Sequence, residues 1–473
     1  MTSPASGGAP LRVLFLAYYF PPLGGAGVQR SVHFVRHLPE HGIAPVVVTG
    51  PAPDDQVWPP RDDTLAALLP PDLEVHRVDG PLEPKPRTRA EAALQRWLLQ
   101  PGDFARRWIA GSLEKGLEAA RGEPVDVVVA SMSPFESAAS AAALADVLGV
   151  PWVADLRDPW ALDEIMVYPS RWHRAVAVSR MARAVRSAAA VVANTPEAAR
   201  AFRAELPGID PARIVTIPNG FEPRDFPAPA PSASAAPPRP RGADAGARFR
   251  VVHTGHLHTL LGTHQRRQQR LRRWIGGMRV PIDLLTRSHV VLAEAVARWL
   301  EREPERRREI ELVFVGPAGE AERRVVRDAG IEDCVRFLGY LDHDRSVESL
   351  LGADLLFLPM HALPHGERAR IVPGKTYEYL AARRPILGAV PEGDARDFLA
   401  ASGLGQLCAP GDAEAMARIL TERHAAWRAG EPAPAANEAF IRRFERANLA
   451  RGLAETLRAV VADAPLEPDP ILG

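Results

Sequence analysis

The stretch Val372–Leu387, VPGKTYEYLAARRPIL, decides how this chain folds. A Pro-Gly turn opens an expected helix, which leads directly into a proline-led apolar strand. Lys375 and Glu378 lie one turn apart at the start of that helix, where they can hold a phosphate and a sugar hydroxyl of one ligand. Spacing alone favours the alternative, a solvent-exposed ion pair. Lysine occurs only at Lys85, Lys115 and Lys375, so its choice at this place points towards a ligand.

Apolar runs alternate with helical patterns on both sides of this stretch. In the second half the runs are RFRVVHTG (248–255), IELVFVG (310–316), CVRFLG (334–339), ADLLFLP (353–359) and PILGAV (385–390). In the first half they are LRVLFLAYY (11–19), PVVVT (45–49), VDVVVA (125–130), PWVAD (151–155), AVVAN (190–194) and RIVTI (213–217). The order of strand, crossover helix and parallel strand predicts sheets covered on both faces. We therefore expect the α/β class, with two doubly wound, Rossmann-like domains facing a central cleft.

A Pro-, Ala- and Ser-rich run divides the chain. FPAPAPSASAAPPRPRGADAG (226–246) cannot pack a core and indicates a linker. We expect an amino-terminal domain over 1–226, a linker over 227–247, a second domain over 248–435, and a terminal helix and tail over 436–473. The stretch 256–287 is an insertion with five arginines between Arg266 and Arg273. A solvated surface is the favoured interpretation of that charge, and contact with anionic lipid or an acidic acceptor is the alternative.

Composition excludes several classes of protein. The 473 residues contain 58 basic and 58 acidic side chains, which argues against a nucleic-acid binder. Cys334 and Cys408 match neither a disulfide framework nor a zinc spacing, so a reducing compartment and no metal are expected. The first apolar run lacks a basic leader, and no apolar stretch is long enough to span a bilayer. The sequence therefore indicates a cytoplasmic protein, with peripheral contact with the inner membrane left open.

Two sequence features near strand ends suggest ligand contacts. Gly24 and Gly25 follow the first expected strand and open a helix, so backbone amides can approach a ligand there, although a plain tight turn explains them equally well. They do not form GxGxxG, which leaves a nicotinamide oxidoreductase only a remote alternative. Arg157 and Asp158 follow another strand end and either face a ligand or form a structural ion pair. Asn219 and the glycine after it predict a turn with positive backbone dihedrals.

The order of the motifs resembles a known family. FPPLGGAGVQR (20–30), PWVADLRDPW (151–160), VVANTPEAA (191–199), IPNGFEPRDF (217–226), HTG (253–255), VFVG (313–316), FLGYLDH (337–343), ADLLFLP (353–359) and PGKTYEYLAARRPIL (373–387) follow one another. This series is similar to the family-4 retaining glycosyltransferases (glycosyl transferases group 1), which have the GT-B fold. The likeness runs from about Leu11 to Leu457 and is specific through its order.

The resemblance implies that the second domain binds a nucleotide-sugar as substrate, with no cofactor. It implies that Glu378 accepts hydrogen bonds from the nucleotide ribose. An arginine and a lysine on the diphosphate match Arg287 and Lys375, with Arg266 or Arg267 as alternatives to Arg287. Substrate-binding roles also pass to Gly24, Gly25, Asn219, Gly255 and Gly374.

Two positions depart from the family's pattern. An acidic residue eight positions before the ribose-binding glutamate usually faces the donor sugar, and this chain has Arg370 there, with Glu367 out of register. A His-Asp pair near the transferred sugar appears here as Arg157 and Asp158. The second change replaces a neutral hydrogen-bond donor with a fixed cation.

The resemblance implies a metal-independent, retaining transferase. It would move a sugar from a nucleotide diphosphate to a hydroxyl of a lipid-linked or cell-surface polysaccharide acceptor held by the amino-terminal domain. The departures at Arg370 and Arg157 keep a second hypothesis open, a catalytically degenerate protein that binds nucleotide or glycan as a scaffold. The base and sugar of the donor, the acceptor and the oligomeric state do not follow from the sequence.

Overall fold

The chain forms two compact units in the computed structural model, which describes residues 9–52, 61–80, 88, 94, 97, 103–226 and 247–472. The amino-terminal unit takes its described residues from 1–163, 168–219 and 446–473, and the carboxyl-terminal unit from 164–167 and 220–445. The chain therefore returns to the amino-terminal unit for its last helix. The expected linker, 227–247, lies outside the described residues except for Ala247.

A seven-stranded parallel sheet forms the centre of the amino-terminal unit, in the order β3-β2-β1-β4-β5-β6-β7. Its strands are β1 (Leu11–Ala17), β2 (Ile43–Thr49), β3 (Val75–Arg77), β4 (Val127–Met132), β5 (Trp152–Leu156), β6 (Ala190–Ala193) and β7 (Ile214–Thr216). Every residue of β4, β5 and β6 is buried, because helices cover both faces of the sheet. The sequence predicted all of these strands except β3, which has three residues and lies at the sheet edge.

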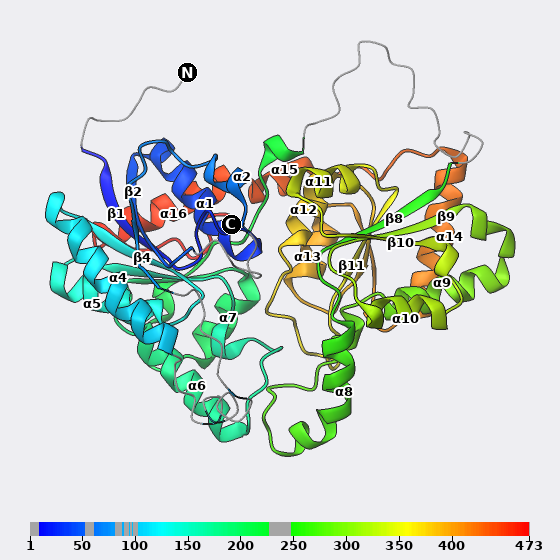
Figure 1. The fold of residues 1–473 in the computed structure, drawn as a ribbon, viewed down its shortest axis with the longest axis horizontal. Coiled ribbons are helices and arrows are strands. Elements are labelled where there is room, and N and C mark those ends of the chain that lie inside the picture. The colour runs from blue at the N-terminus through cyan, green and yellow to red at the C-terminus, as the bar shows by residue number, and fades with distance from the viewer. Residues whose placement is uncertain are drawn as a thin grey trace, which may run out of the picture. The chain divides into compact units, whose positions relative to one another are not determined.

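Helices cover this first sheet on both sides (Figure 1). They are α1 (Ala26–His37), α2 (Asp63–Ala66), α4 (Asp103–Gly122), α5 (Ser137–Leu148), α6 (Arg171–Ala184), α7 (Pro196–Glu205) and α16 (Arg446–Val461). In α1 the buried residues Val28, Val32 and Val35 repeat at helical spacing and form the face that packs inward. The terminal helix α16 packs beside α1 and adds Leu453 and Leu457 to the same core.

The carboxyl-terminal unit repeats the design with six parallel strands in the order β10-β9-β8-β11-β12-β13. They are β8 (Phe249–Thr254), β9 (Ile310–Val315), β10 (Val335–Gly339), β11 (Leu355–Pro359), β12 (Ile386–Ala389) and β13 (Gly405–Cys408). The helices are α8 (Thr259–Trp274), α9 (Val290–Arg302), α10 (Glu320–Asp328), α11 (His343–Leu351), α12 (Lys375–Ala382), α13 (Asp394–Ala401), α14 (Ala413–Ala429) and α15 (Glu438–Ile441). The predicted α/β class with two Rossmann-like domains is confirmed.

The terminal helix expected within 436–473 is not one continuous element. The chain forms α15, then a short 3-10 turn over Arg442–Phe444, and α16 begins only at Arg446. Glu445 is extended, with ψ 132°, which interrupts the helical ladder, and the carbonyl of Phe444 accepts a hydrogen bond from the Phe221 amide at 3.0 Å. The Phe444 ring is fully buried within 5.2 Å of Tyr377, centroid to centroid. Packing of this ring thus fixes the break.

The predicted positive dihedrals at Asn219 and Gly220 are also wrong, since neither residue has a positive φ. The Asn219 side chain instead accepts a hydrogen bond from Arg30 Nη1 at 3.2 Å. Within the ranges that the structure describes, no helix has both the length and the apolarity needed to cross a membrane.

Candidate active site

The carboxyl end of β8 holds the buried His253, which orients Lys375 at the start of α12. His253 Nδ1 lies 2.9 Å from the carbonyl oxygen of Phe357, which can only accept, so Nδ1 carries the proton. The other ring nitrogen, Nε2, lies 3.1 Å from Lys375 Nζ and accepts from the ammonium. Burial and the Lys375 charge hold the pKa of His253 well below its ordinary value. A neutral imidazole therefore anchors the lysine.

Glycines leave room on both sides of this lysine. Gly255 has φ +91°, and a Cβ there would lie 3.0 Å from Lys375 Nζ, so a larger residue would crowd the ammonium. Gly374 stands at the entrance to α12, and a Cβ there would meet no atom within 4 Å. The approach to the first turn of α12 is therefore open on the side of Gly374, where backbone N–H groups favour an anion.

Arg287 supplies a second positive charge at the same edge of the sheet. Its carbonyl accepts from the His258 amide at 3.1 Å, and the adjacent Thr286 hydroxyl donates to the Met360 carbonyl at 3.0 Å. These bonds fix the Arg287 backbone beside the ends of β8 and β11. Burial first, and then the Arg287 charge, lower the pKa of Lys375 to about 7, while Glu378 opposes the shift. An anion between the two cations would relieve their repulsion.

Glu378 lies one turn along α12 and is partly exposed. Burial raises the pKa of Glu378, whereas the charges of His343 and Lys375 lower it. His343 Nε2 is 2.9 Å from Asp225 Oδ2, and this hydrogen bond raises the pKa of His343. The roles of Asp225 and His343 could not be predicted from the sequence, although each lies in a motif quoted above, because a pairing across 118 residues leaves no local signal.

Arg370, the residue in place of the expected acid, is buried, and its amide donates to Glu164 Oε1 at 3.1 Å. Glu164 is itself buried, and His361 Nε2 lies 3.3 Å from the same oxygen. Burial acts to raise the pKa of Glu164, but His361 holds the pKa below its ordinary value. The out-of-register Glu367 pairs with Arg279 at 3.2 Å. A buried acid, Glu164, thus lies beside the Arg370 backbone, in a short segment that belongs to the carboxyl-terminal unit.

Arg266 and Arg267, the two alternatives to Arg287 as phosphate contacts, have different surroundings from Arg287. Arg266 forms a bidentate ion pair with Asp283, with Nε 2.9 Å from Oδ1, so its charge is already neutralised. Arg267 is exposed on α8. Of the three candidate arginines, Arg287 alone appears among the charges that shift the pKa of Lys375.

Asp155, at the end of β5 in the amino-terminal unit, has a structural role. Its carboxylate is fully buried, accepts from Arg30 Nη2 at 2.7 Å, and accepts from the Ser131 hydroxyl at 3.0 Å. Arg30 also donates to the carbonyls of Ile217 and Pro218, so it ties α1 to the loop after β7. The glycine-loop helix is thereby locked onto the sheet.

Arg157 lies against the glycine loop that opens α1. Its Nε donates to the Met132 carbonyl at 2.8 Å, and a Cβ on Gly27 would lie 3.4 Å from its Nη1. Burial lowers the pKa of Arg157. Gly25, with φ +94°, precedes α1, and Gly24 is buried. The structure therefore brings Arg157 to the predicted loop, while the adjacent Asp158 is exposed.

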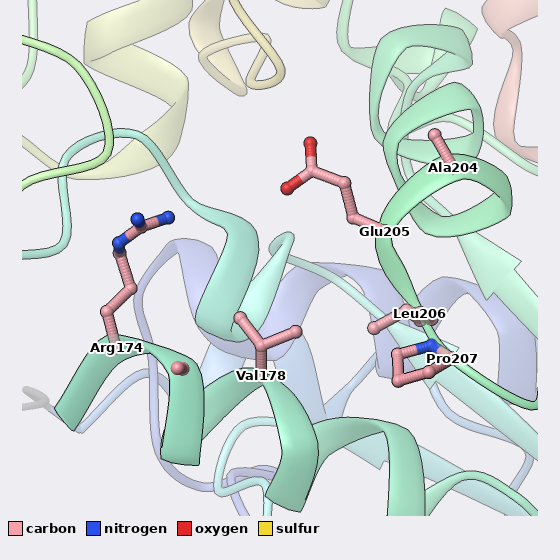
Figure 2. A pocket seen from close by; sticks show the side chains of 7 residues that line it. Arg174, Val178, Ala204, Glu205, Leu206 and Pro207 are labelled. Carbon is pink, nitrogen blue, oxygen red and sulfur yellow. The ribbon is translucent and has the colours of Figure 1, made fainter. Parts of the chain in front are cut away.

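A pocket between α6 and α7 lies apart from all of these residues. Figure 2 shows Arg174 on one side of it, Val178 in the middle, and Glu205, Leu206 and Pro207 on the other side. None of the predicted site residues lines it. The candidate site is therefore the carboxyl edge of the second sheet, and this pocket is a separate feature.

Two family models match the chain. Residues 24–220 match the Glycosyl transferase 4-like domain, and residues 275–423 match Glycosyl transferases group 1. Together the matches cover well over half of the chain, and each one falls on a sheet-and-helix domain described above. The protein is a glycosyltransferase of the GT-B fold, and it belongs to the group 1 family, as its motif order predicted.

Solved structures share this fold at low sequence identity. HepE from Anabaena, in complex with UDP and glucose, gives a TM-score of 0.54 at 18% identity over 95% of this chain and 100% of that chain. A glycosyltransferase from Rickettsia africae gives 0.59 at 13% over 96% and 100%. Sucrose-phosphate synthase from Thermosynechococcus elongatus gives 0.59 at 15% over 96% and 100%. No curated protein sequence matches the chain.

Proposed function

We propose that this protein is a retaining, metal-independent glycosyltransferase that uses a nucleotide diphosphate sugar and an acceptor hydroxyl on a lipid-linked or cell-surface glycan. The observation that carries the donor assignment is Lys375, held by His253 and Gly255 beside Arg287 at an open helix N-terminus. The similar fold of HepE, which binds UDP, supports a nucleotide donor.

The proposed chemistry separates a sugar from a diphosphate. The bond between the anomeric carbon and the diphosphate oxygen breaks, a bond from the acceptor oxygen forms on the same face, and the acceptor proton passes to the departing oxygen. Negative charge develops on the diphosphate as it leaves, and Arg287, Lys375 and the first amides of α12 stabilise that charge. These fixed cations supply the charge that a divalent metal supplies elsewhere, which is our reason for proposing metal independence.

The other residues receive binding roles in this proposal. Glu378, beside the Asp225–His343 pair, accepts from hydroxyls of the nucleotide ribose. Gly255 and Gly374 leave room for the diphosphate to approach Lys375. Arg370 is buried, and its backbone amide is bonded to Glu164, so we assign it a supporting place beside the substrate. In the amino-terminal unit, the loop of Gly24 and Gly25, together with Arg157, Asp158 and Asn219, keeps its predicted role in contacting the sugar and acceptor. Localisation in the cytoplasm remains part of the proposal.

A transfer assay tests the proposal. Purified protein is incubated with UDP-, GDP- and TDP-sugars and a cell-envelope lipid extract, with and without EDTA, and the product's anomeric configuration is read by NMR. We expect transfer from one donor, unaffected by EDTA, with the donor's configuration kept. An inverted product would contradict retention, and loss with EDTA that added metal restores would contradict metal independence.

The scaffold hypothesis makes a different prediction in the same assay. A degenerate protein would bind a nucleotide diphosphate but release or transfer no sugar from any donor in the panel. Nucleotide binding without turnover, and the absence of binding altogether, are therefore separate outcomes. Binding without turnover would support the nucleotide site but contradict a transferase activity. The absence of binding would contradict the nucleotide site itself.

A further inference from the structure

A long stretch around α6 carries only positive charge. From residue 165 to 196 the chain has no Asp or Glu but has Arg171, Arg174, Arg180, Arg183 and Arg186, although acidic and basic residues are equal in number over the whole chain. Within α6 the side chains of Arg171, Arg180 and Arg183 are exposed. Arg174 differs, because it is partly buried and borders the pocket in Figure 2. A cationic surface of the amino-terminal unit thus lies on one helix.

Two exposed tryptophans stand on the same part of the unit. Trp172 is 64% exposed and Trp97 is 57% exposed, which is unusual for the largest apolar side chain. Both rings contact the buried His173, with centroids 5.0 and 4.6 Å away. His173 is fixed in turn by Ser170, whose Oγ is 2.8 Å from Nδ1. Both exposed indoles therefore pack against the same buried imidazole. Leu94, one helical turn before Trp97, is 57% exposed as well.

Trp172 and Arg183 share one stripe of α6, and the exposed Arg171 flanks it. Trp172 and Arg183 are eleven residues apart, which is three helical turns or about 16 Å along the same stripe of α6. Tryptophan settles at the depth of lipid headgroups, where its ring is apolar and its N–H finds a polar partner, and arginine reaches anionic headgroups from the same depth. The lack of acidic residues along α6 favours an anionic bilayer over a protein partner, because an acidic side chain on this face would be repelled by the bilayer.

We infer that the face formed by Trp97, Trp172, Arg171 and Arg183 docks the amino-terminal unit on an anionic lipid bilayer, with the indoles in the headgroup layer. The inference does not depend on the donor site. It is also distinct from the basic insertion, where Trp274 on α8 is 84% exposed but belongs to the other unit.

Vesicle flotation tests this assignment with the full-length chain. The vesicles contain phosphatidylcholine alone or phosphatidylcholine with phosphatidylglycerol. We expect flotation only with phosphatidylglycerol, and we expect added NaCl to weaken it because salt screens surface charge. Substituting Arg171→Gln together with Arg183→Gln lowers the partition coefficient about 25-fold, since each arginine near an anionic surface contributes about fivefold. Trp97→Ser with Trp172→Ser also releases the protein.

Matched variants separate this face from the rest of the molecule. Trp274→Ser removes a more exposed tryptophan, and Arg324→Gln removes an arginine on α10 whose side chain is 75% exposed. Both should float as the unchanged protein does, and all variants should keep its melting temperature. Flotation that survives the double tryptophan change, or that Trp274→Ser abolishes, would overturn the assignment. So would a dimer that the Trp97 and Trp172 changes disperse, because the face would then belong to a second copy.

Discussion

Lys375 is the residue whose surroundings say most about the chemistry. Its ammonium has a neutral imidazole, His253, as its hydrogen-bond acceptor and shares its edge of the sheet with Arg287. A carboxylate partner would neutralise the charge of a buried lysine. Lys375 instead lies where burial and the charge of Arg287 destabilise its protonated form. Under the proposed function, the diphosphate of the donor is the anion that stabilises this charge when it binds.

The pKa of Lys375, lowered to about 7, makes nucleotide binding depend on pH. Below pH 7 the free protein already carries the proton. Above pH 7 the proton must be taken up when the anion binds, so affinity falls with rising pH by up to about tenfold per unit. Calorimetry with UDP between about pH 7.5 and pH 8.5, where the nucleotide's own charge changes little, measures this slope. Lys375→Arg should flatten it, and an equal slope in that variant would assign the proton to another group.

Gly255→Ala should impair nucleotide binding more than it impairs folding. The added methyl group would lie 3.0 Å from Lys375 Nζ and would sit on a backbone with φ +91°. Gly366→Ala is the matched control, because φ is +83° there and a Cβ meets nothing within 4 Å. Both variants should lose about 1–2 kcal/mol of stability from backbone strain. Only Gly255→Ala should weaken UDP binding, and equal affinities in the two variants would show that the crowding is harmless.

At the scale of elements, the buried pair between Arg30 and Asp155 joins α1 to β5. Asp155→Asn leaves Arg30 buried and uncompensated, so we expect the free energy of unfolding to fall by about 3–5 kcal/mol. Urea denaturation followed by circular dichroism measures the loss. Asp146→Asn, the same change at an exposed residue of α5, should stay close to the unchanged protein. A loss below about 1 kcal/mol for Asp155→Asn would show that the pair does not lock the helix.

Most elements could be predicted from the sequence because buried parallel strands are continuous apolar runs. The exceptions have physical reasons: β3 is three residues long and starts with the exposed Val75, and β13 is only partly buried and includes a glycine and a glutamine. The break before α16 depends on a distant aromatic contact of Phe444, which no local pattern reports.

The candidate site was less predictable than the fold. Lys375, Glu378, Gly255 and Arg287 carry local signals or family positions, and the structure gathers them in one unit. The partners that set the properties of Lys375 and Glu378, namely His253, His343 and Asp225, come from separate segments of the chain, as does Glu164 beside Arg370. Their roles follow from three-dimensional proximity, and a carboxylate supplied by Glu164 could not be foreseen from the arginine at position 370.

At the scale of the whole molecule, the last helix belongs to the first unit. Leu453 of α16 is fully buried in the core of that unit, next to the α1 residues. Leu453→Ala should therefore cost about 2–5 kcal/mol by leaving a cavity. Calorimetry should show a lower melting temperature for the amino-terminal unit, with the carboxyl-terminal unit unchanged. Leu420→Ala, a fully buried leucine of α14 in the other core, should reverse the pattern. A common shift of both units in both variants would show that they unfold as one.

The central claim is that Lys375 grips the diphosphate of a nucleotide donor, and isothermal titration calorimetry with UDP, GDP and TDP near pH 7 tests it most directly. The unchanged protein should bind at least one of them. Lys375→Ala should weaken that binding by roughly 30-fold or more, the effect of losing about 2 kcal/mol of charged contact. Lys115→Ala, at the exposed Lys115–Glu118 pair, should not alter it. No binding of any of the three, or equal affinity in the two lysine variants, would contradict the account.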